Sequence, residues 1–185
     1  MDPTERDQIR AALHGDRDVF EMIIRNQSRT LFAVAYGVLQ NREEAEDAVQ
    51  DAFIKAWKSR WLVRDPEKFP AWLATIARNR ARDVVRRRRT VPLPENFDDI
   101  ADTEAPAAGE QMDGAQLNRQ VHSALSALPE THRTALTLRY LQDMDYQTIE
   151  RTMGLTNGAL RGILGRALGS MRKELRPALA TLPFP

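Results

Sequence analysis

The chain has 185 residues, of which 29% are charged, and 27 lysines and arginines oppose 26 aspartates and glutamates for a formal net charge of +1. It contains no cysteine, which excludes a disulfide framework, a thiolate metal site and redox sensing within the chain and fits the cytoplasm. The longest nearly apolar run, residues 31–39, is too short to span a bilayer, and the N-terminus lacks a signal-peptide core. We therefore expect a soluble protein without membrane insertion.

Helix signals recur along the chain, and no stretch shows the alternation of apolar and polar residues that is typical of strands. Capping side chains, or a proline that opens a helix, stand before several amphipathic segments. These positions are Asp2, Asp16, Asn41, Asp65 and Pro129. The sequence therefore predicts an all-α fold.

The composition changes sharply near residue 90. Residues 78–89 contain seven arginines, whereas residues 90–118 contain seven acidic residues and no lysine or arginine. The second stretch also has three prolines and few large apolar residues, so it buries too little surface to fold alone. We expect two small helical domains, residues 1–89 and 115–185, joined by a flexible acidic linker over residues 90–114.

The first informative helix is predicted around residues 45–57. Its apolar residues recur at three- and four-residue steps and therefore share one face that can enter a core. They are Ala45, Ala48, Val49, Ala52, Phe53, Ala56 and Trp57. The residues left outside are Glu43, Glu44, Asp47, Gln50 and Asp51. This acidic face is open to three interpretations: a solvated surface, a docking surface, or a Mg²⁺ site built on Glu44, Asp47 and Asp51.

A second helix follows, and its outer face is basic. Its buried stripe is formed by Phe69, Trp72, Leu73, Ile76 and Ala77. Its outer face carries Arg78, Asn79, Arg82 and Arg86. Clustered arginines on a helix indicate a solvated face or a nucleic-acid-binding surface.

Aromatic residues around the connecting loop favour nucleic acid. The loop, residues 58–68, holds Arg60 and Arg64 beside Trp61, an arrangement in which bases can stack next to a phosphate-binding surface. Trp57 and Trp72 lie on the apolar stripes, so we expect them in the core. Trp61 is open to either role.

The segment 145–161 has the pattern of a helix-turn-helix. Gly154 supplies the turn and Thr156 can cap the following helix, while Asn157 and Arg161 point outward where side chains reach base edges in a major groove. The inward residues expected on this helix are Leu160, Leu164, Ala167 and Met171. The preceding core residues are expected to be Leu125, Leu128, Leu136, Leu138 and Leu141.

The segments 45–57, 72–83 and 145–161 together resemble bacterial sigma factors of the small extracytoplasmic-function group, and the resemblance covers residues 16–176. It implies a protein without catalytic residues or a cofactor that docks on core RNA polymerase and directs it to promoter DNA. It also implies sequestration by an anti-sigma factor. In this family the interdomain linker threads the active-site cleft of the polymerase.

The resemblance assigns roles to particular residues. Polymerase docking falls to Asp47, Gln50, Asp51 and Lys55. Capture of the minus-ten strand falls to Arg60, Trp61, Arg78, Asn79, Arg82, Asp83 and Arg86. Recognition of the minus-thirty-five element falls to Thr156, Asn157, Arg161 and Arg166.

The sequence departs from the family pattern in the last helix. Ile163 and Leu168 stand at positions that are usually basic, which predicts weaker phosphate binding. Glycines recur there at three- and four-residue steps, namely Gly158, Gly162, Gly165 and Gly169. A helix with so many glycines needs tertiary support or a partner, so we expect unusual DNA specificity or binding of a protein such as an anti-sigma factor.

Two other functions remain as alternatives. A free-standing helix-turn-helix regulator needs only the C-terminal half and leaves the pattern over residues 45–83 unexplained. A carboxylate-metal nuclease would act through Asp47 and Asp51 and would cleave nucleic acid alone with Mg²⁺.

Overall fold

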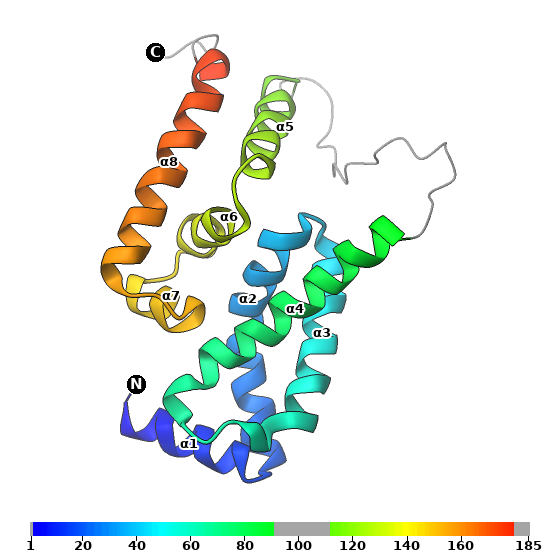
Figure 1. Ribbon diagram of the computed structural model, residues 1–185, viewed down its shortest axis with the longest axis vertical. Coiled ribbons are helices and arrows are strands. Elements are labelled where there is room, and N and C mark those ends of the chain that lie inside the picture. The colour runs from blue at the N-terminus through cyan, green and yellow to red at the C-terminus, as the bar shows by residue number, and fades with distance from the viewer. Residues whose placement is uncertain (1, 91–111, 180–185) are drawn as a thin grey trace.

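The computed structural model describes residues 2–90 and 112–179 of the chain. Within these two stretches every regular element is helical, which confirms the all-α expectation there (Figure 1). Helices α1 to α4 form an N-terminal domain, and helices α5 to α8 form a C-terminal domain. None of the described helices is both long enough and apolar enough to cross a membrane.

The N-terminal helices are α1 (Pro3–Leu13), α2 (Arg17–Leu39), α3 (Arg42–Ser59) and α4 (Phe69–Thr90). Two short 3-10 turns, Arg60–Leu62 and Pro66–Lys68, connect α3 to α4. The predicted capping side chains are confirmed: Asp16 accepts a hydrogen bond from the Val19 amide at 3.1 Å, and Asn41 accepts one from the Glu44 amide at 3.0 Å. Asp2 and Asp65 cap in the same way. Local sequence therefore sets where these helices begin.

The core of the N-terminal domain is a seam of small residues between α2, α3 and α4. The apolar stripe predicted for α3 is confirmed, because its alanines are buried, while Phe53 and Trp57 pack at the edge. Phe69, at the start of α4, is fully buried, and Trp72 lies beside it with ring centroids 5.7 Å apart. Alanines at a helix contact bring the helix axes close together, so the outward faces of α3 and α4 are fixed relative to one another.

The C-terminal helices are α5 (Met112–Ser126), α6 (Glu130–Leu136), α7 (Tyr146–Met153) and α8 (Asn157–Leu179). The predicted linker, residues 90–114, lies mostly outside the described residues, but α5 begins at Met112, within that range. Leu128, Leu136, Leu138 and Ile149 are buried against the inner face of α8, which confirms most of the expected core.

The prediction that Leu141 belongs to this core is wrong. Its side chain is 58% exposed, and that of the neighbouring Tyr140 is 56% exposed. The reason is local: α6 continues as a π-helical turn, Thr137–Leu141, whose extra residue per turn rotates its end away from the core.

The helix-turn-helix is formed by α7 and the start of α8. Gly154 ends α7 with φ of +66°, a left-handed conformation that glycine adopts without strain. The segment before α7 is held by Arg139, whose guanidinium donates to the Met144 carbonyl at 3.0 Å and to Asp143 at 3.2 Å. The predicted turn is therefore confirmed.

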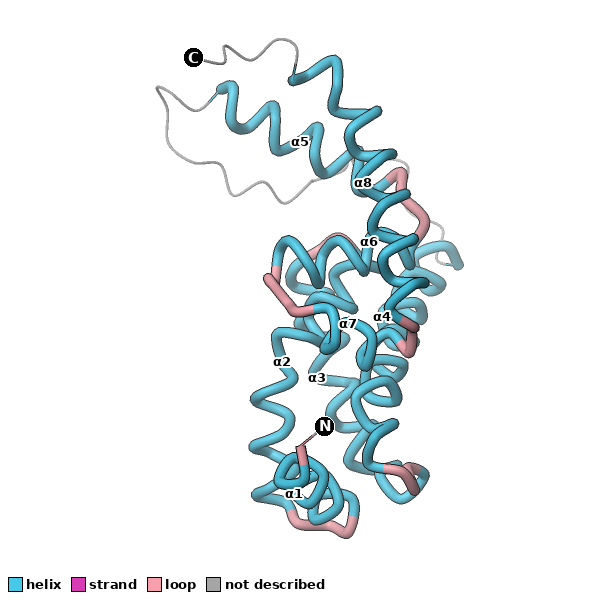
Figure 2. Tube along the Cα trace, turned by 90° about the vertical axis from the view of Figure 1, so that its left-hand side faces the viewer, coloured by secondary structure: helices cyan, strands magenta, loops and turns pink. Residues whose placement is uncertain are grey.

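The two domains are packed together. Helix α6 lies against α2, and α7 lies against α4, while the far parts of α5 and α8 extend away from the N-terminal domain (Figure 2). One continuous cluster of buried side chains runs through both domains. Residues far apart in sequence, on α4 and α6, therefore come within ion-pair distance.

We predict that Phe69→Ala lowers the free energy of unfolding by about 3–5 kcal/mol, because it removes a fully buried aromatic side chain. Urea unfolding followed by circular dichroism measures the change. Trp61→Ala is the control, because that side chain is 67% exposed and its loss should change stability by no more than about 0.5 kcal/mol. Equal losses in the two variants would contradict this description of the core.

A second prediction concerns Asp145, which caps α7. Hydrogen bonds from the Thr148 hydroxyl and amide lower the pKa of Asp145 below its usual value. Its charge therefore stabilises the fold above the unfolded-state pKa of about 3.9, and this contribution is lost as the pH falls through the lower folded-state pKa.

Asp145→Asn keeps an oxygen for the Thr148 amide but cannot ionise. We expect this variant to be about 0.5–1 kcal/mol less stable than the parent near neutral pH and equally stable at about pH 2–3. Urea titrations across that range test this. A difference that did not change with pH would show that ionisation of Asp145 contributes nothing.

Candidate polymerase and nucleic-acid interfaces

The acidic face of α3 is free of the ion pairs that neutralise other carboxylates. Asp47, Gln50 and Asp51 are exposed, and neither carboxylate forms an ion pair with any described residue. Glu44, by contrast, is held by Arg88 of α4. Coulombic attraction can therefore act between Asp47, Asp51 and basic groups on a partner.

An apolar side chain lies on the same face and was missed by the sequence reasoning. Ile54 is 56% exposed and follows Asp47 by seven residues and Asp51 by three, spacings that place all three on one side of a helix. Lys55 is also exposed at the margin. The spacing was the available signal for Ile54, and the face combines charge with an apolar contact.

No group of three or more His, Cys, Asp or Glu side chains is arranged to hold a metal ion among the residues that the structure describes. Glu44, one of the three carboxylates considered for Mg²⁺, is occupied by the Arg88 guanidinium. The three residues of that hypothesis therefore do not form a shared site here.

The turn between α3 and α4 presents aromatic and apolar side chains to solvent. Trp61 and Leu62 are each 67% exposed, whereas Trp57 is half-buried and meets Phe20 edge-on with ring centroids 5.0 Å apart. The core position expected for Trp57 is confirmed. Leu62 is a second residue that the sequence reasoning missed, and its pattern gave no signal because it lies in an irregular turn.

Arg60 is folded back onto the domain. Its guanidinium carbon lies 4.0 Å from the centre of the Trp57 ring, and its Nη1 donates to the Trp57 carbonyl at 2.7 Å. Its Nη2 also lies near Gly15, in the turn between α1 and α2. A side chain tied at this many points positions the turn that carries Trp61.

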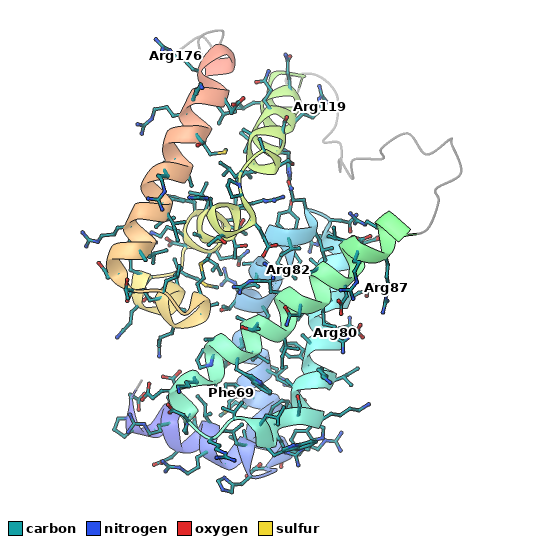
Figure 3. All side chains as sticks on the ribbon, in the orientation of Figure 1. Phe69, Arg80, Arg82, Arg87, Arg119 and Arg176 are labelled. Carbon is teal, nitrogen blue, oxygen red and sulfur yellow. The ribbon has the colours of Figure 1, made fainter. Side chains whose placement is uncertain are left out.

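The arginines of α4 are divided between two sides of the helix. Arg80 and Arg87 lie on the side away from the C-terminal domain, whereas Arg82 faces it (Figure 3). Asn79 is exposed, and Asp83 pairs with Arg86 at 2.8 Å. The predicted set is thus on one helix, but only part of it faces open solvent.

Arg78 and Arg82 are engaged by the C-terminal domain. Glu130 of α6 accepts from Arg82 Nε and Nη2, both at 3.0 Å, and lies 3.9 Å from Arg78 Nε. Burial is the main influence on Arg78 and lowers its pKa, against the opposing effect of the Glu130 carboxylate. Glu130 was missed in the sequence reasoning, because nothing local links α6 to α4.

The start of α8 has the geometry expected of a recognition helix. Thr156 caps it by accepting a hydrogen bond from the Ala159 amide at 3.3 Å. Asn157 and Arg161 are exposed, and their side chains are held by the first helix of the motif. Asn157 donates to Glu150 at 2.5 Å, and the Arg161 guanidinium lies 5.9 Å from the centre of the Tyr146 ring.

The departure from the family pattern in α8 has a different meaning from the one expected. Ile163 is buried and Leu168 packs against the core, so both positions support the fold and neither faces a ligand. Arg166 is exposed and its guanidinium covers Gly162. Weaker phosphate binding therefore does not follow from these two apolar residues.

Comparison with known protein families gives two matches. The model for sigma-70 region 2 matches residues 23–91, and the model for sigma-70 region 4 matches residues 118–171. These ranges contain α3 and α4 in the first case and the helix-turn-helix in the second.

Curated relatives agree. The chain is 30% identical to the RNA polymerase sigma-H factor of Pseudomonas aeruginosa, over 95% of this chain and 96% of that protein. It is 32% identical to the probable RNA polymerase sigma factor RfaY of Xanthomonas campestris, over 89% of this chain but only 42% of that protein. The chain thus spans less than half the length of the latter relative. Other relatives are named ECF RNA polymerase sigma factors, from Mycolicibacterium smegmatis and Bacillus subtilis.

Two solved structures share the fold. The structure of CnrH in complex with the cytosolic domain of CnrY matches with a TM-score of 0.64 at 23% identity, covering 94% of this chain and 97% of that one. The sigma factor RpoE in complex with the anti-sigma factor NepR from Bartonella quintana matches with a TM-score of 0.55 at 22% identity, covering 85% and 96%. With both sigma-70 regions in order along an all-α chain, and a full-length relative at 30% identity, this chain belongs to the sigma-70 family of RNA polymerase sigma factors, in its extracytoplasmic-function group.

Proposed function

We propose that the chain binds core RNA polymerase and directs it to promoters by recognising their minus-ten and minus-thirty-five elements. The observation that carries this proposal is the separation of two exposed faces within one small domain. An unpaired acidic face lies on α3, while arginines and an exposed tryptophan lie on α4 and the turn before it. A protein that joins a basic partner to an acidic nucleic acid needs such a separation.

Docking on the polymerase is assigned to the face of α3. Asp47, Gln50 and Asp51 attract basic residues on the partner, Lys55 borders the contact, and Ile54 adds an apolar anchor. Charge pairs of this kind set orientation and association rate, and an apolar side chain at the centre adds affinity.

Capture of the minus-ten strand is assigned to the α3–α4 turn and to α4. Trp61 and Leu62 offer an exposed surface on which an unpaired base can stack, and Arg60 holds that turn in place. Along α4, Arg78, Asn79, Arg82, Asp83 and Arg86 line the path of the strand. Stacking of a flipped base gives discrimination that phosphate contacts lack.

Recognition of the minus-thirty-five element is assigned to the helix-turn-helix. The N-terminal end of α8 carries Thr156, Asn157 and Arg161 for the major groove, and Arg166 lies farther along on the exposed side for phosphate contact. The protein has no catalytic role of its own in this proposal and needs no cofactor. It acts in the cytoplasm, where the polymerase is.

Control by an anti-sigma factor is part of the proposal. It is supported by the solved structure of a related fold, in which the sigma factor RpoE is bound to the anti-sigma factor NepR. The linker of this chain, residues 90–114, is proposed to enter the polymerase cleft, and its acidic composition supports that role.

Run-off transcription on a pooled promoter library tests the docking face. We expect Asp47→Lys with Asp51→Lys to weaken binding to core polymerase at least about tenfold and to abolish the selective transcripts, because like charges then meet at the contact. The control is Asp18→Lys with Glu174→Lys, which changes the net charge equally at exposed positions elsewhere. Equal loss in both double variants would reject this face.

We also predict that Trp61→Ala lowers the yield of open promoter complexes about tenfold, because stacking of one base on an aromatic ring contributes about 1–3 kcal/mol. Permanganate footprinting of the opened strand measures this yield. Trp61→Phe keeps an aromatic face and should restore most of it, while polymerase binding stays unchanged in both variants. An unchanged yield with alanine would leave Trp61 without a role in the strand.

A further inference from the structure

The contact between the two domains covers part of α4. Glu130 of α6 accepts two hydrogen bonds from the fork of Arg82, at 3.0 Å each, and lies 3.9 Å from Arg78. This geometry matches the bidentate pairing by which a guanidinium holds a carboxylate or a phosphate. Glu130 therefore occupies the donors that a nucleic-acid phosphate would need.

A close approach of α2 and α6 brings Glu130 into place. A Cβ atom on Gly37, in the buried face of α2, would lie 2.7 Å from Thr134 Oγ1 and 3.0 Å from Thr134 Cα. The second neighbour is backbone and cannot swing aside. Only glycine fits at position 37 in this arrangement, although alanine would suit a helix better.

The rest of the contact is polar and incompletely satisfied. Arg151 of α7 pairs with Glu5 of α1 at 3.3 Å, and Ser126 donates to Gln40 at 2.6 Å. The Thr134 hydroxyl and Arg151 Nε are buried without a hydrogen-bond partner, which costs free energy. An interface of this kind resembles those that open and close more than the permanently buried kind.

From these observations we propose that the free protein holds itself in a closed state in which Glu130 masks Arg78 and Arg82, and that binding nucleic acid at these arginines requires α6 to leave α2 and α4. The proposal rests on the role given above to the arginines of α4. The closed state and the strand-bound state are mutually exclusive, because one fork cannot hold both anions.

Two variants open the contact in different ways. Gly37→Ala introduces a clash with α6 and changes no charge, and Gly169→Ala is its matched control, because a Cβ at Gly169 meets nothing within 4 Å. Glu130→Gln removes the carboxylate from Arg82, and Glu43→Gln is its control, because it removes the same charge from an exposed position on α3.

The absence of cysteine makes distance measurement direct. Spin labels on Arg17→Cys and Ser170→Cys, both exposed and one in each domain, report the separation of the domains in the full chain without polymerase. We expect a single narrow distance distribution in the parent and in Gly169→Ala, and a broad, longer one in Gly37→Ala. A broad distribution in the parent, or an unchanged one in Gly37→Ala with native helix content, would overturn the closed state.

Masking is tested by binding of a fluorescein-labelled single-stranded oligonucleotide of mixed sequence. If the open state is about a tenth of the population, Gly37→Ala and Glu130→Gln should each bind about tenfold more tightly than the parent and their controls. Adding Arg82→Ala to Gly37→Ala should cancel the gain.

The two assays separate the two proposals. Wider domain separation without tighter binding would overturn masking and remove Arg82 from the strand-binding set, while the closed state would stand. Tighter binding in Glu43→Gln as large as in Glu130→Gln would show a general charge effect and would also overturn masking.

Discussion

The seam of small residues between α2, α3 and α4 is the constraint on which the rest of the structure depends. Ala48, Ala52 and Ala77 are almost completely buried, and side chains of this size bring the helices close together. Their closeness fixes the outward direction of every other residue on α3 and α4. An acidic face and a basic face can therefore belong to one small domain and stay apart, with the pair formed by Glu44 and Arg88 joining them at one end.

The amino-acid sequence was sufficient for whatever depends on short-range patterns. Helix starts at Asp16 and Asn41 follow from single hydrogen bonds between residues three apart, and Gly154 ends α7 because its backbone conformation is local. Burial along α3 followed from its period. The prediction failed at Leu141, where a π-helical turn changes the period within a few residues, and a regular repeat cannot anticipate that change.

Contacts between distant segments could not be predicted from the pattern. Glu130 meets Arg82 across 48 residues of sequence, and nothing in α6 alone distinguishes this glutamate from a solvated one. Ile163 shows the converse: a comparison of residue types suggests a lost basic contact, whereas packing shows a core position. Family pattern identifies which helices matter, and tertiary structure decides which side of each helix is available.

The closed contact also bears on how partners are used in sequence. Polymerase docking needs the face of α3, which α6 does not cover, whereas strand binding needs Arg82, which it does. The exposed Asp47 and Asp51 can therefore meet the polymerase while the domains remain together. Binding free energy gained there, and from separate contacts of the C-terminal domain, can offset the loss of the pair with Glu130, because a ligand shifts such an equilibrium only by its preference for the open state. A sigma factor built this way would hold its arginines away from stray nucleic acid until the polymerase has separated the domains.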